Sequence, residues 1–523
     1  MSAKSAIFVL DASRAKLICA LLGAAFLAHA AWYNFMSDDG FIVLRYASNL
    51  VHGEGLVFNP GDRVEGFSSW SWVLLIAGGQ SLGCDPVVFA RVAGVGAGLL
   101  TIAVSLLLGF SLTPAGASSG WALWGPLVVA ANAPFACWAP AGLETALYGC
   151  LLTATAWAAT TERTRALAAL STLCLLTRPE AVLLIVVLAV LRGRVRDDTW
   201  RSTLRVWIFP AAALLGQSVC RWLYYGDLLP NTFYAKTGGS WAQWARGFHY
   251  LLDYAGDHEG LPLMVVPVVV GLAAADRRLR MVAGLVVATW ASIVWEGGDG
   301  LPMYRFMVPV VPLAAVLLGA VTARGYQIVM AYLGPAAVAP RVAVMTLLAA
   351  VACVHARAPG MDAHYGNYEY QEEVEVPRWA RVGLWLRNEA RPEDSFASVP
   401  IGAVAYYSGL RTYDMVGLTD RHIAHRQMPA MGHGIAGHEK HDGAYIVSQR
   451  PTYLLLGNID VTPRPRDPAV RPFIPHGAWP IADRETDVFD ADGFEELYEP
   501  RSVRIGPTEY LNFYQLRDEF RRR

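Results

Sequence analysis

The chain has 523 residues, of which 54% are hydrophobic and 17% are charged, and its formal net charge at pH 7 is −1. Such an apolar composition excludes an ordinary soluble protein and indicates an integral membrane protein with a polar appendage. A net charge this close to zero provides no field that would recruit nucleic acid, so we expect no nucleic-acid partner.

Twelve apolar segments follow one another along the first two thirds of the chain. The first one lacks a convincing signal-peptide cleavage site, so we interpret it as a retained helix. Several are shorter than the roughly 20 residues of a straight span, so not all of them are independent crossings. The segments are 17–35, 70–83, 87–112, 119–137, 145–160, 166–177, 179–191, 206–222, 261–275, 281–296, 305–322 and 341–356.

Arginine-rich loops give the orientation of these segments. The loops at 163–165, 192–205 and 277–280 are expected on the cytoplasmic side by the positive-inside rule. The resulting parity predicts a polytopic α-helical membrane protein with about 11 crossings, its N-terminus inside and its C-terminus outside. The number of crossings between residues 70 and 140 stays open.

From about residue 357 the sequence becomes polar and rich in proline. Residues 382–389 suit an amphipathic helix, and 395–407 and 445–456 are predicted as short strands between turn signals. We expect a periplasmic soluble domain of the α/β or α+β class. The predicted domains are therefore a transmembrane domain, 1–356, and an extracytoplasmic domain, 357–523.

The spacing of cysteines and histidines argues against a metal site. All seven cysteines lie in the apolar part without a Cys-x-x-Cys pair, which disfavours disulfides and zinc–thiolate sites. Five histidines gather between residues 422 and 441, but they match no standard motif. The step from His433 to His438 does not put both on one helical face. We predict no metal and no other cofactor.

Five polar islands lie at the predicted outer edges of the membrane segments. A carboxylate there can accept the proton of an attacking hydroxyl, and Arg or Lys can hold a phosphate as it leaves. The catalytic candidates are Asp38, Asp39 and Glu144. The substrate-binding candidates are Arg45, His52, Arg178, Lys236, Asp299, Tyr304 and Arg305.

Each island also has a purely structural interpretation. The two adjacent aspartates could be a solvated helix end, and a carboxylate favours a helix N-terminus. The other interpretations are a helix cap for Glu144, an intramembrane ion pair of Arg178 with Glu180, a snorkelling anchor for Lys236, a turn for Asp299 and a helix cap for Arg305.

Seven motifs stand in a characteristic order along the chain. They are Asp-Asp-Gly-Phe-Ile-Val-Leu-Arg-Tyr-Ala-Ser-Asn-Leu at 38–50, Gly-Glu-Gly-Leu-Val-Phe-Asn-Pro-Gly-Asp-Arg-Val-Glu-Gly at 53–66, Gly-Leu-Glu-Thr at 142–145, Leu-Thr-Arg-Pro-Glu at 176–180, Tyr-Tyr-Gly-Asp-Leu-Leu-Pro-Asn-Thr-Phe-Tyr-Ala-Lys at 224–236, Gly-Gly-Asp-Gly-x-x-x-Tyr-Arg-Phe-x-Val-Pro at 297–309 and the segment 402–424. In this order they resemble bacterial GT-C glycosyltransferases. The nearest family is the cell-envelope terminal β-(1→2)-arabinofuranosyltransferases, and the resemblance extends from about residue 30 to 455.

The resemblance implies a GT-C-like catalytic domain that uses a polyprenyl-phosphate-linked sugar on the outer face of the bacterial cytoplasmic membrane. It implies a catalytic aspartate in the first outer loop, here Asp38 or Asp39. It makes Lys236 and Arg305 the foremost donor-phosphate candidates, followed by Arg178. Arabinofuranose is favoured as the sugar, and related enzymes use mannose or aminoarabinose.

The implied partners are the lipid-linked sugar, membrane lipid, and an acceptor that is an envelope glycan, a protein or a lipid. The oligomeric state stays open. In the mechanism that we expect, Lys236 and Arg305 clamp the donor phosphate while Asp38 or Asp39 activates the acceptor hydroxyl. A flippase for lipid-linked sugars is the rival from another class, but it would more often show internal repeats, which this sequence lacks.

Overall fold

The computed structural model describes residues 12–192, 200–258, 260–334, 337–357, 368–429, 431–470, 473–474 and 485–521. Part of the arginine-rich loop 192–205 and the first residues of the predicted soluble domain lie outside the described residues. The chain forms two compact units. The helical unit comprises Met1–Phe35, Ala90–Gly216 and Gly247–Asn367, and the mixed unit comprises Met36–Phe89, Gln217–Arg246 and Tyr368–Arg523. The predicted division at residue 356 concerns membrane location and stays a prediction.

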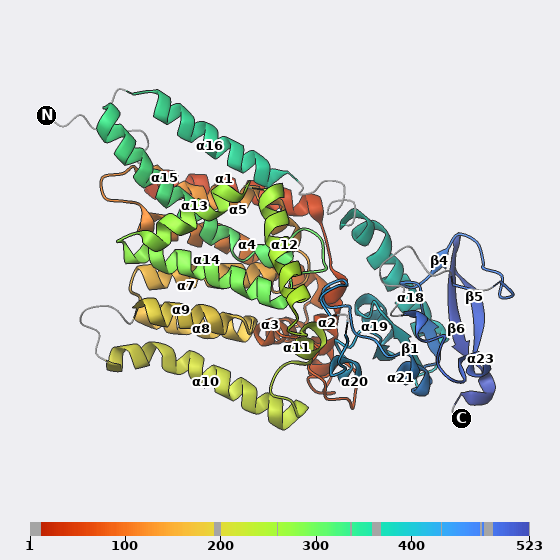
Figure 1. The fold of residues 1–523 in the computed structure, drawn as a ribbon. Helices are drawn as coiled ribbons and strands as arrows, with labels where there is room; N and C mark the ends of the chain where they lie inside the picture. Colours follow the sequence, from red (N-terminus) through yellow and green to blue (C-terminus); the bar gives the residue numbers. More distant parts are fainter. Residues whose placement is uncertain are drawn as a thin grey trace. The chain divides into compact units, whose positions relative to one another are not determined.

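The helical unit is a bundle in which α7, α8, α9 and α14 lie side by side (Figure 1). Its core contains large buried side chains such as Trp124 and Tyr254, which pack among alanines and branched residues. The helices that contribute to this unit, some of which run into the mixed unit, are α1 (Ala12–Tyr33), α4 (Pro86–Leu112), α5 (Trp124–Ala131), α6 (Ala133–Trp138), α7 (Thr145–Thr160), α8 (Thr164–Thr177), α9 (Ala181–Arg192), α10 (Trp200–Tyr225), α12 (Trp241–Asp257), α13 (Gly260–Ala273), α14 (Arg277–Glu296), α15 (Val311–Leu333) and α16 (Ala339–Ala356), with short 3₁₀ helices η1 (Ser119–Leu123) and η2 (Arg305–Met307).

All twelve predicted apolar segments coincide with helical structure. Within the described residues, six helices are long and apolar enough to cross a membrane, namely α1, α4, α10, α14, α15 and α16. Large apolar side chains on several of them are exposed, for example Trp32 at 77% and Leu215 at 67%. Exposed apolar surface of this kind fits contact with lipid, so the fold is that of a polytopic membrane protein. The predicted number of about 11 crossings stays a prediction.

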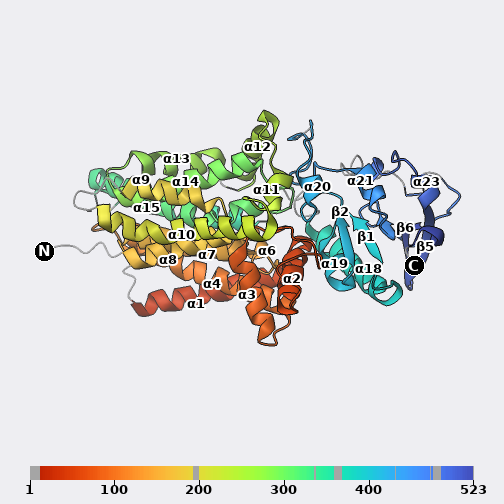
Figure 2. The same ribbon diagram turned by 90° about the horizontal axis from the view of Figure 1, so that it is seen from below.

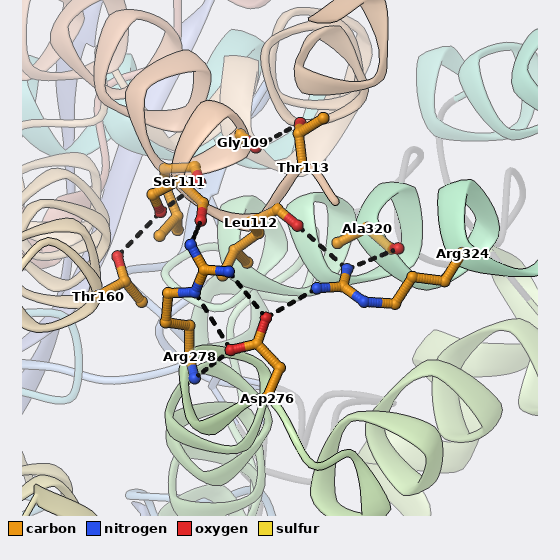
Figure 3. Close-up of polar contacts among 10 residues, drawn as sticks. Gly109, Ser111, Leu112, Thr113, Thr160, Asp276, Arg278, Ala320 and Arg324 are labelled. Atoms are coloured by element: carbon orange, nitrogen blue, oxygen red, sulfur yellow. Dashed lines mark hydrogen bonds and ion pairs between the residues drawn. The ribbon is translucent and has the colours of Figure 1, made fainter. Parts of the chain in front are cut away.

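An ionic cluster in the helical unit joins the end of α4 and the start of α14 to a side chain within α15 (Figure 3). Asp276 caps α14 by accepting a hydrogen bond from the backbone N–H of Arg278, and its carboxylate also accepts from the side chains of Arg278 and Arg324. The two arginines donate in turn to the carbonyl oxygens of Ser111 and Leu112 at the end of α4. Carbonyl groups at a helix C-terminus lack intrahelical partners, so this cluster ties α4 to α14 and α15.

The mixed unit is built on a six-stranded sheet with the order β2-β1-β3-β6-β4, in which β5 pairs with the other edge of β6. β1 is parallel to β2 and β3, and β6 is antiparallel to its neighbours. The strands are β1 (Ser395–Ser398), β2 (Arg411–Asp414), β3 (Tyr453–Leu455), β4 (Val461–Thr462), β5 (Tyr498–Gly506) and β6 (Glu509–Leu516). The helices that contribute to it are α2 (Asp38–Val51), α3 (Trp70–Ser81), α11 (Asn231–Lys236), α18 (Val376–Glu389), α19 (Gly402–Ser408), α20 (Arg421–Ala424), α21 (Gly443–Ser448) and α23 (Phe494–Leu497).

The C-terminal part is a mixed α and β domain, as predicted, and the predicted helix at 382–389 forms the end of α18. Two predicted strands are partly wrong. Only residues 395–398 of the first are extended, and 402–408 form α19, which ends at Gly409 in the left-handed region. In the second, 443–448 form α21 because the Asp442 side chain caps the backbone N–H of Tyr445. Figure 2 shows α18 and α19 beside one another.

Candidate active site

In the helical unit, three glutamates surround one arginine. Arg178 follows the end of α8 in an extended conformation, as expected for a residue that precedes proline. Its Nη1 lies 2.9 Å from Glu144 Oε1, its Nε 2.5 Å from Glu180 Oε1 and its Nη2 4.0 Å from Glu296 Oε2. The predicted ion pair of Arg178 with Glu180 therefore exists, and its location within the membrane stays a prediction. Glu144 precedes α7, but its side chain makes no capping hydrogen bond to the backbone of that helix. Its carboxylate pairs with Arg178 instead.

The loop after α14 holds the second arginine. Arg305 donates to Asp299 through two hydrogen bonds, and both side chains are buried. The preceding residues Met303 and Tyr304 have φ values of 60° and 46°, which residues other than glycine seldom adopt. The Trp138 indole N–H lies 3.1 Å from the Met303 carbonyl oxygen and helps to hold this strained backbone. Strain of this kind concentrates at functional sites.

A cavity lies between these two clusters within the helical unit. Its volume is about 20 Å³, which is room for a water molecule. Both guanidinium groups contact the ring of Phe306, at 5.2 Å for Arg178 and 5.0 Å for Arg305. The polar residues that line it are Thr145, Tyr148, Arg178, Glu180, Thr289, Ser292, Glu296 and Arg305.

The charge around the cavity constrains what it can bind. The two arginines face four carboxylates, since Asp299 pairs with Arg305 and three glutamates approach Arg178. A phosphodiester that approaches these arginines therefore meets carboxylates that already accept from several of their N–H groups. Tyr304, a predicted substrate-binding residue beside the cavity, donates its hydroxyl to Asp257 Oδ2 at 2.5 Å.

In the mixed unit, the predicted aspartate pair opens helix α2. Asp38 and Asp39 are its first two residues, where a negative charge interacts favourably with the helix dipole. Asp38 Oδ2 accepts from the backbone N–H of Gly402 at 2.9 Å, and Oδ1 from that of Ala403 at 2.7 Å. Burial raises the pKa of the Asp38 carboxyl to about 7, although these two donors lower it.

Two other predicted site residues, one on α2 and one just after it, contact backbone carbonyl groups. Arg45 is buried, and its guanidinium donates to the backbone carbonyl oxygens of Phe58, Ala405 and Leu410. His52 follows the last residue of α2, and its Nδ1 lies 2.6 Å from the carbonyl oxygen of Ser48. Both side chains thus have backbone partners, and their predicted contact with substrate stays a prediction.

Lys236 is the last residue of α11, and a loop of the C-terminal region packs along its side chain. A Cβ atom added to Gly437 would lie 3.3 Å from Lys236 Cε. Glu439 holds this loop, because its Oε1 accepts from the backbone N–H groups of Gly432 and Gly434 and pairs with Arg246 at 3.0 Å. The aliphatic part of Lys236 is thus supported by the loop 432–439.

Known proteins similar to this chain carry sugar-transferase names. A terminal β-(1→2)-arabinofuranosyltransferase of Mycobacterium tuberculosis is 30% identical over 264 residues, which are 47% of this chain and 42% of the relative. The Corynebacterium glutamicum protein of the same name is 28% identical over 373 residues, 59% of this chain and 52% of the relative. The chain matches about half the length of these curated relatives. A family model described as a domain of unknown function (DUF8728) matches residues 364–505.

The solved structure of ArnT from Cupriavidus metallidurans, bound to undecaprenyl phosphate, is similar over 77% of this chain and 86% of that chain, with a TM-score of 0.51 and 13% identity. The chain has a GT-C fold. The resemblance indicated by the seven motifs is thereby confirmed, both by the names of the two relatives and by this fold.

Within this GT-C fold, several charged side chains form contacts that the sequence did not predict. Glu296 is the last residue of α14 and faces Arg178, and its position at the end of an apolar helix was the available signal. Glu65 and Arg221 form a buried ion pair in the mixed unit at 2.8 Å. The Asp414 carboxylate accepts from the backbone N–H groups of Val416, Gly417 and Thr419.

The histidines of the 422–441 segment have individual partners in the mixed unit. His422 Nε2 lies 2.9 Å from Asp442, and His441 Nδ1 lies 2.7 Å from Asp487. In the part of the chain that the structure describes, no three His, Cys, Asp or Glu side chains are arranged to hold a metal ion. The prediction that the protein uses no metal stays a prediction.

Proposed function

We propose that the protein is a glycosyltransferase that moves a sugar, with arabinofuranose favoured, from a polyprenyl-phosphate carrier to an envelope glycan. The observation that carries this proposal is the similarity to two terminal β-(1→2)-arabinofuranosyltransferases, which is joined to a GT-C fold. ArnT, which shares the fold, was solved with undecaprenyl phosphate, and this supports a lipid-phosphate donor. Fold alone does not fix the sugar.

The reaction takes place on the outer face of the bacterial cytoplasmic membrane, in a chain with about 11 crossings and an extracytoplasmic C-terminal domain. The carboxylate pair at the head of α2 supplies the general base. It accepts the proton of the acceptor hydroxyl while the oxygen forms a bond to the anomeric carbon of the sugar. The bond from that carbon to the phosphate oxygen breaks, and polyprenyl phosphate leaves.

The leaving phosphate gains negative charge, which cationic side chains stabilise. Arg305 is oriented by Asp299, and Lys236 by the loop 432–439, so both are restrained before the donor binds. Arg178 is engaged with glutamates and holds the cavity wall. No metal is required, because a phosphodiester carries one negative charge that two basic groups can balance.

The test uses membranes that contain the wild-type protein or an Asp38→Asn or Asp39→Asn variant. Each preparation receives radiolabelled polyprenyl-phosphate arabinose or, separately, polyprenyl-phosphate mannose, and the release of free polyprenyl phosphate is followed. We expect release from the arabinose donor and its loss in at least one aspartate variant. Release from the mannose donor alone would overturn the favoured sugar. Label that crosses the bilayer without release would show a flippase and overturn the proposed function.

A further inference from the structure

Helix α2 holds helix α19 through three contacts along one face. At the start of α19, the Asp38 carboxylate accepts from two backbone N–H groups. In its second half, the rings of Tyr406 and Tyr407 lie 5.6 Å from that of Phe41. Arg45 donates to the carbonyl oxygen of Ala405 within α19 and to that of Leu410 just after it.

The contact with Asp38 matches the polarity of α19. The free N–H groups of a helix lie at its N-terminus, and Asp38 supplies an acceptor for two of them. Arg45 adds donors for the Ala405 carbonyl oxygen, which also accepts from the Gly409 N–H, and for the Leu410 carbonyl oxygen beyond the helix. Residues 38, 41 and 45 are three and four positions apart, which places them on one face of α2.

The approach at the first of these contacts is very close. A Cβ atom added to Gly402 would lie 1.9 Å from the Asp38 carbonyl oxygen and 2.7 Å from its Cγ atom. Any larger residue at position 402 would therefore push the two helices apart. On its other side α19 packs against α18, where a Cβ atom on Gly383 would lie 2.8 Å from the Val404 carbonyl oxygen. Both neighbours thus fix α19 in place.

Asp39 lies on a different face of α2. Successive residues of an α-helix are turned by about 100°, so the Asp39 side chain leaves the helix away from the face that contacts α19. A carboxylate whose two oxygens both accept backbone N–H groups is fixed in orientation. The first turn of α2, and with it the direction of Asp39, is then set by the Asp38 contact.

We propose that Asp38 is a positioning residue, which α19 of the C-terminal region holds, and that Asp39 is the general base. This assignment rests on the proposed function. It gives the C-terminal region a direct part in the reaction, since α19 orients the helix that carries the base. It also separates two adjacent aspartates that the sequence alone leaves equivalent.

The test compares Asp39→Asn, Asp38→Asn, Gly402→Ala and the double variant Asp38→Asn/Gly402→Ala, all in the full chain. Gly78→Ala is the matched control, because a Cβ atom at that helical glycine meets nothing within 4 Å. Turnover of polyprenyl-phosphate arabinose gives kcat and KM. Hydrogen exchange at the amides of Gly402 and Ala403 reports on the contact without reference to activity.

We expect Asp39→Asn to lower kcat by about 10²- to 10⁴-fold, as the loss of a general base does. Asp38→Asn and Gly402→Ala should each lower kcat by up to about 10²-fold with an unchanged donor KM. The kcat of the double variant should equal that of the less active single variant, because both changes break the same contact. Asp38→Asn should speed hydrogen exchange at the amides of Gly402 and Ala403, and Asp39→Asn should leave it unchanged.

The pH profile distinguishes positioning from a merely structural role. Asp38→Asn should keep the acidic limb of the kcat/KM profile, because the base that titrates is still present. Loss of that limb in Asp38→Asn, or full turnover in Gly402→Ala, would overturn the assignment. A wild-type protein without turnover of either donor would instead overturn the proposed function, and the role of Asp39 with it.

Discussion

Asp299 binds Arg305 through two parallel hydrogen bonds, from Nε to Oδ2 at 2.7 Å and from Nη2 to Oδ1 at 2.8 Å. Both side chains are less than a tenth exposed. Such bidentate geometry fixes the plane of the guanidinium. The Gly-rich loop that carries Asp299 therefore does more than form a turn.

The first prediction concerns this pair. Asp299→Ala should lower the free energy of unfolding by about 3–5 kcal/mol, because it removes the carboxylate that pairs with a buried guanidinium. The double change Asp299→Ala/Arg305→Met should recover part of this loss, since no buried charge remains. Thermal unfolding of the purified protein in detergent measures both. An Asp299→Ala protein as stable as wild type would contradict the prediction.

The second prediction compares a buried ion pair with an exposed one in the mixed unit. Glu65 pairs with Arg221 and accepts from the Trp70 indole, and both charged side chains are almost fully buried. Asp62 pairs with Arg411, and these side chains are 38% and 44% exposed. Glu65→Ala should cost about 3–5 kcal/mol of stability, and the control Asp62→Ala about 1 kcal/mol or less. Equal losses in the two variants would contradict this.

Local sequence patterns predicted more of the fold than of the site. Among the described residues, apolar segments mark the six helices that are long and apolar enough to cross a membrane, because burial in lipid or protein requires an apolar surface whatever the tertiary contacts are. Arg178 with Glu180 was anticipated as a pair because its members are two positions apart. The contact of Arg178 with Glu144 was not, since it joins residues 34 positions apart.

The residue types alone do not reveal which groups a charged side chain contacts in the fold. Arg45 and His52 were predicted to touch substrate because charged and titratable groups are rare beside a membrane. Their partners are backbone carbonyl groups, which every residue carries and which no sequence pattern identifies. Helices α2 and α11 belong to one unit with the C-terminal sheet. This grouping depends on contacts between residues far apart in the sequence, which local patterns do not identify.

The third prediction concerns pH. Burial raises the pKa of Glu375 to about 7, and the charge of Asp38 adds to this, so the folded protein binds a proton that the unfolded chain has released at the same pH. Stability should therefore fall as the pH rises from about 4.5 to about 7 and should level off above that. Asp38, whose pKa is also raised to about 7, contributes in the same direction.

Glu375→Gln tests this pH dependence, because it removes the titrating group and keeps the shape of the side chain. The melting temperature of this variant should change less between about pH 5 and pH 8 than that of the wild type. Glu389→Gln, on the exposed end of α18, is the control and should keep the wild-type slope. A Glu375→Gln protein with the wild-type slope would refute the role of Glu375.

The fourth prediction concerns the helix ends in Figure 3. Asp276→Ala removes a helix cap and the acceptor of two arginines at once, and should cost about 1–3 kcal/mol of stability. Asp85 only caps the start of α4, through the backbone N–H of Val88, so Asp85→Ala should cost less. Denaturant unfolding measures both losses. Turnover at saturating donor should be unchanged in Asp276→Ala, and its loss would assign this cluster to the reaction.

The fifth prediction concerns Tyr148 in the cavity of the helical unit. Its hydroxyl is buried and has no hydrogen-bond partner among the residues that the structure describes. A buried hydroxyl without a partner is costly, so Tyr148→Phe should leave stability unchanged or raise it. A sugar hydroxyl or phosphate oxygen that enters the cavity would supply the missing partner. The donor KM should then rise by about 2- to 12-fold in Tyr148→Phe, the equivalent of one hydrogen bond of about 0.5–1.5 kcal/mol.

Tyr326 provides the matched control for this measurement. Its hydroxyl likewise has no partner among the described residues, but it lies on α15 beside Trp121 and does not line the cavity. Tyr326→Phe removes the same atom, so any general effect of losing a buried hydroxyl will appear in both variants. A rise in donor KM in Tyr148→Phe alone would place the donor at the cavity, beside Arg178 and Arg305. Equal KM values in the two variants and the wild type would mean that the donor binds elsewhere, and that the unpartnered hydroxyl of Tyr148 serves only a bound water.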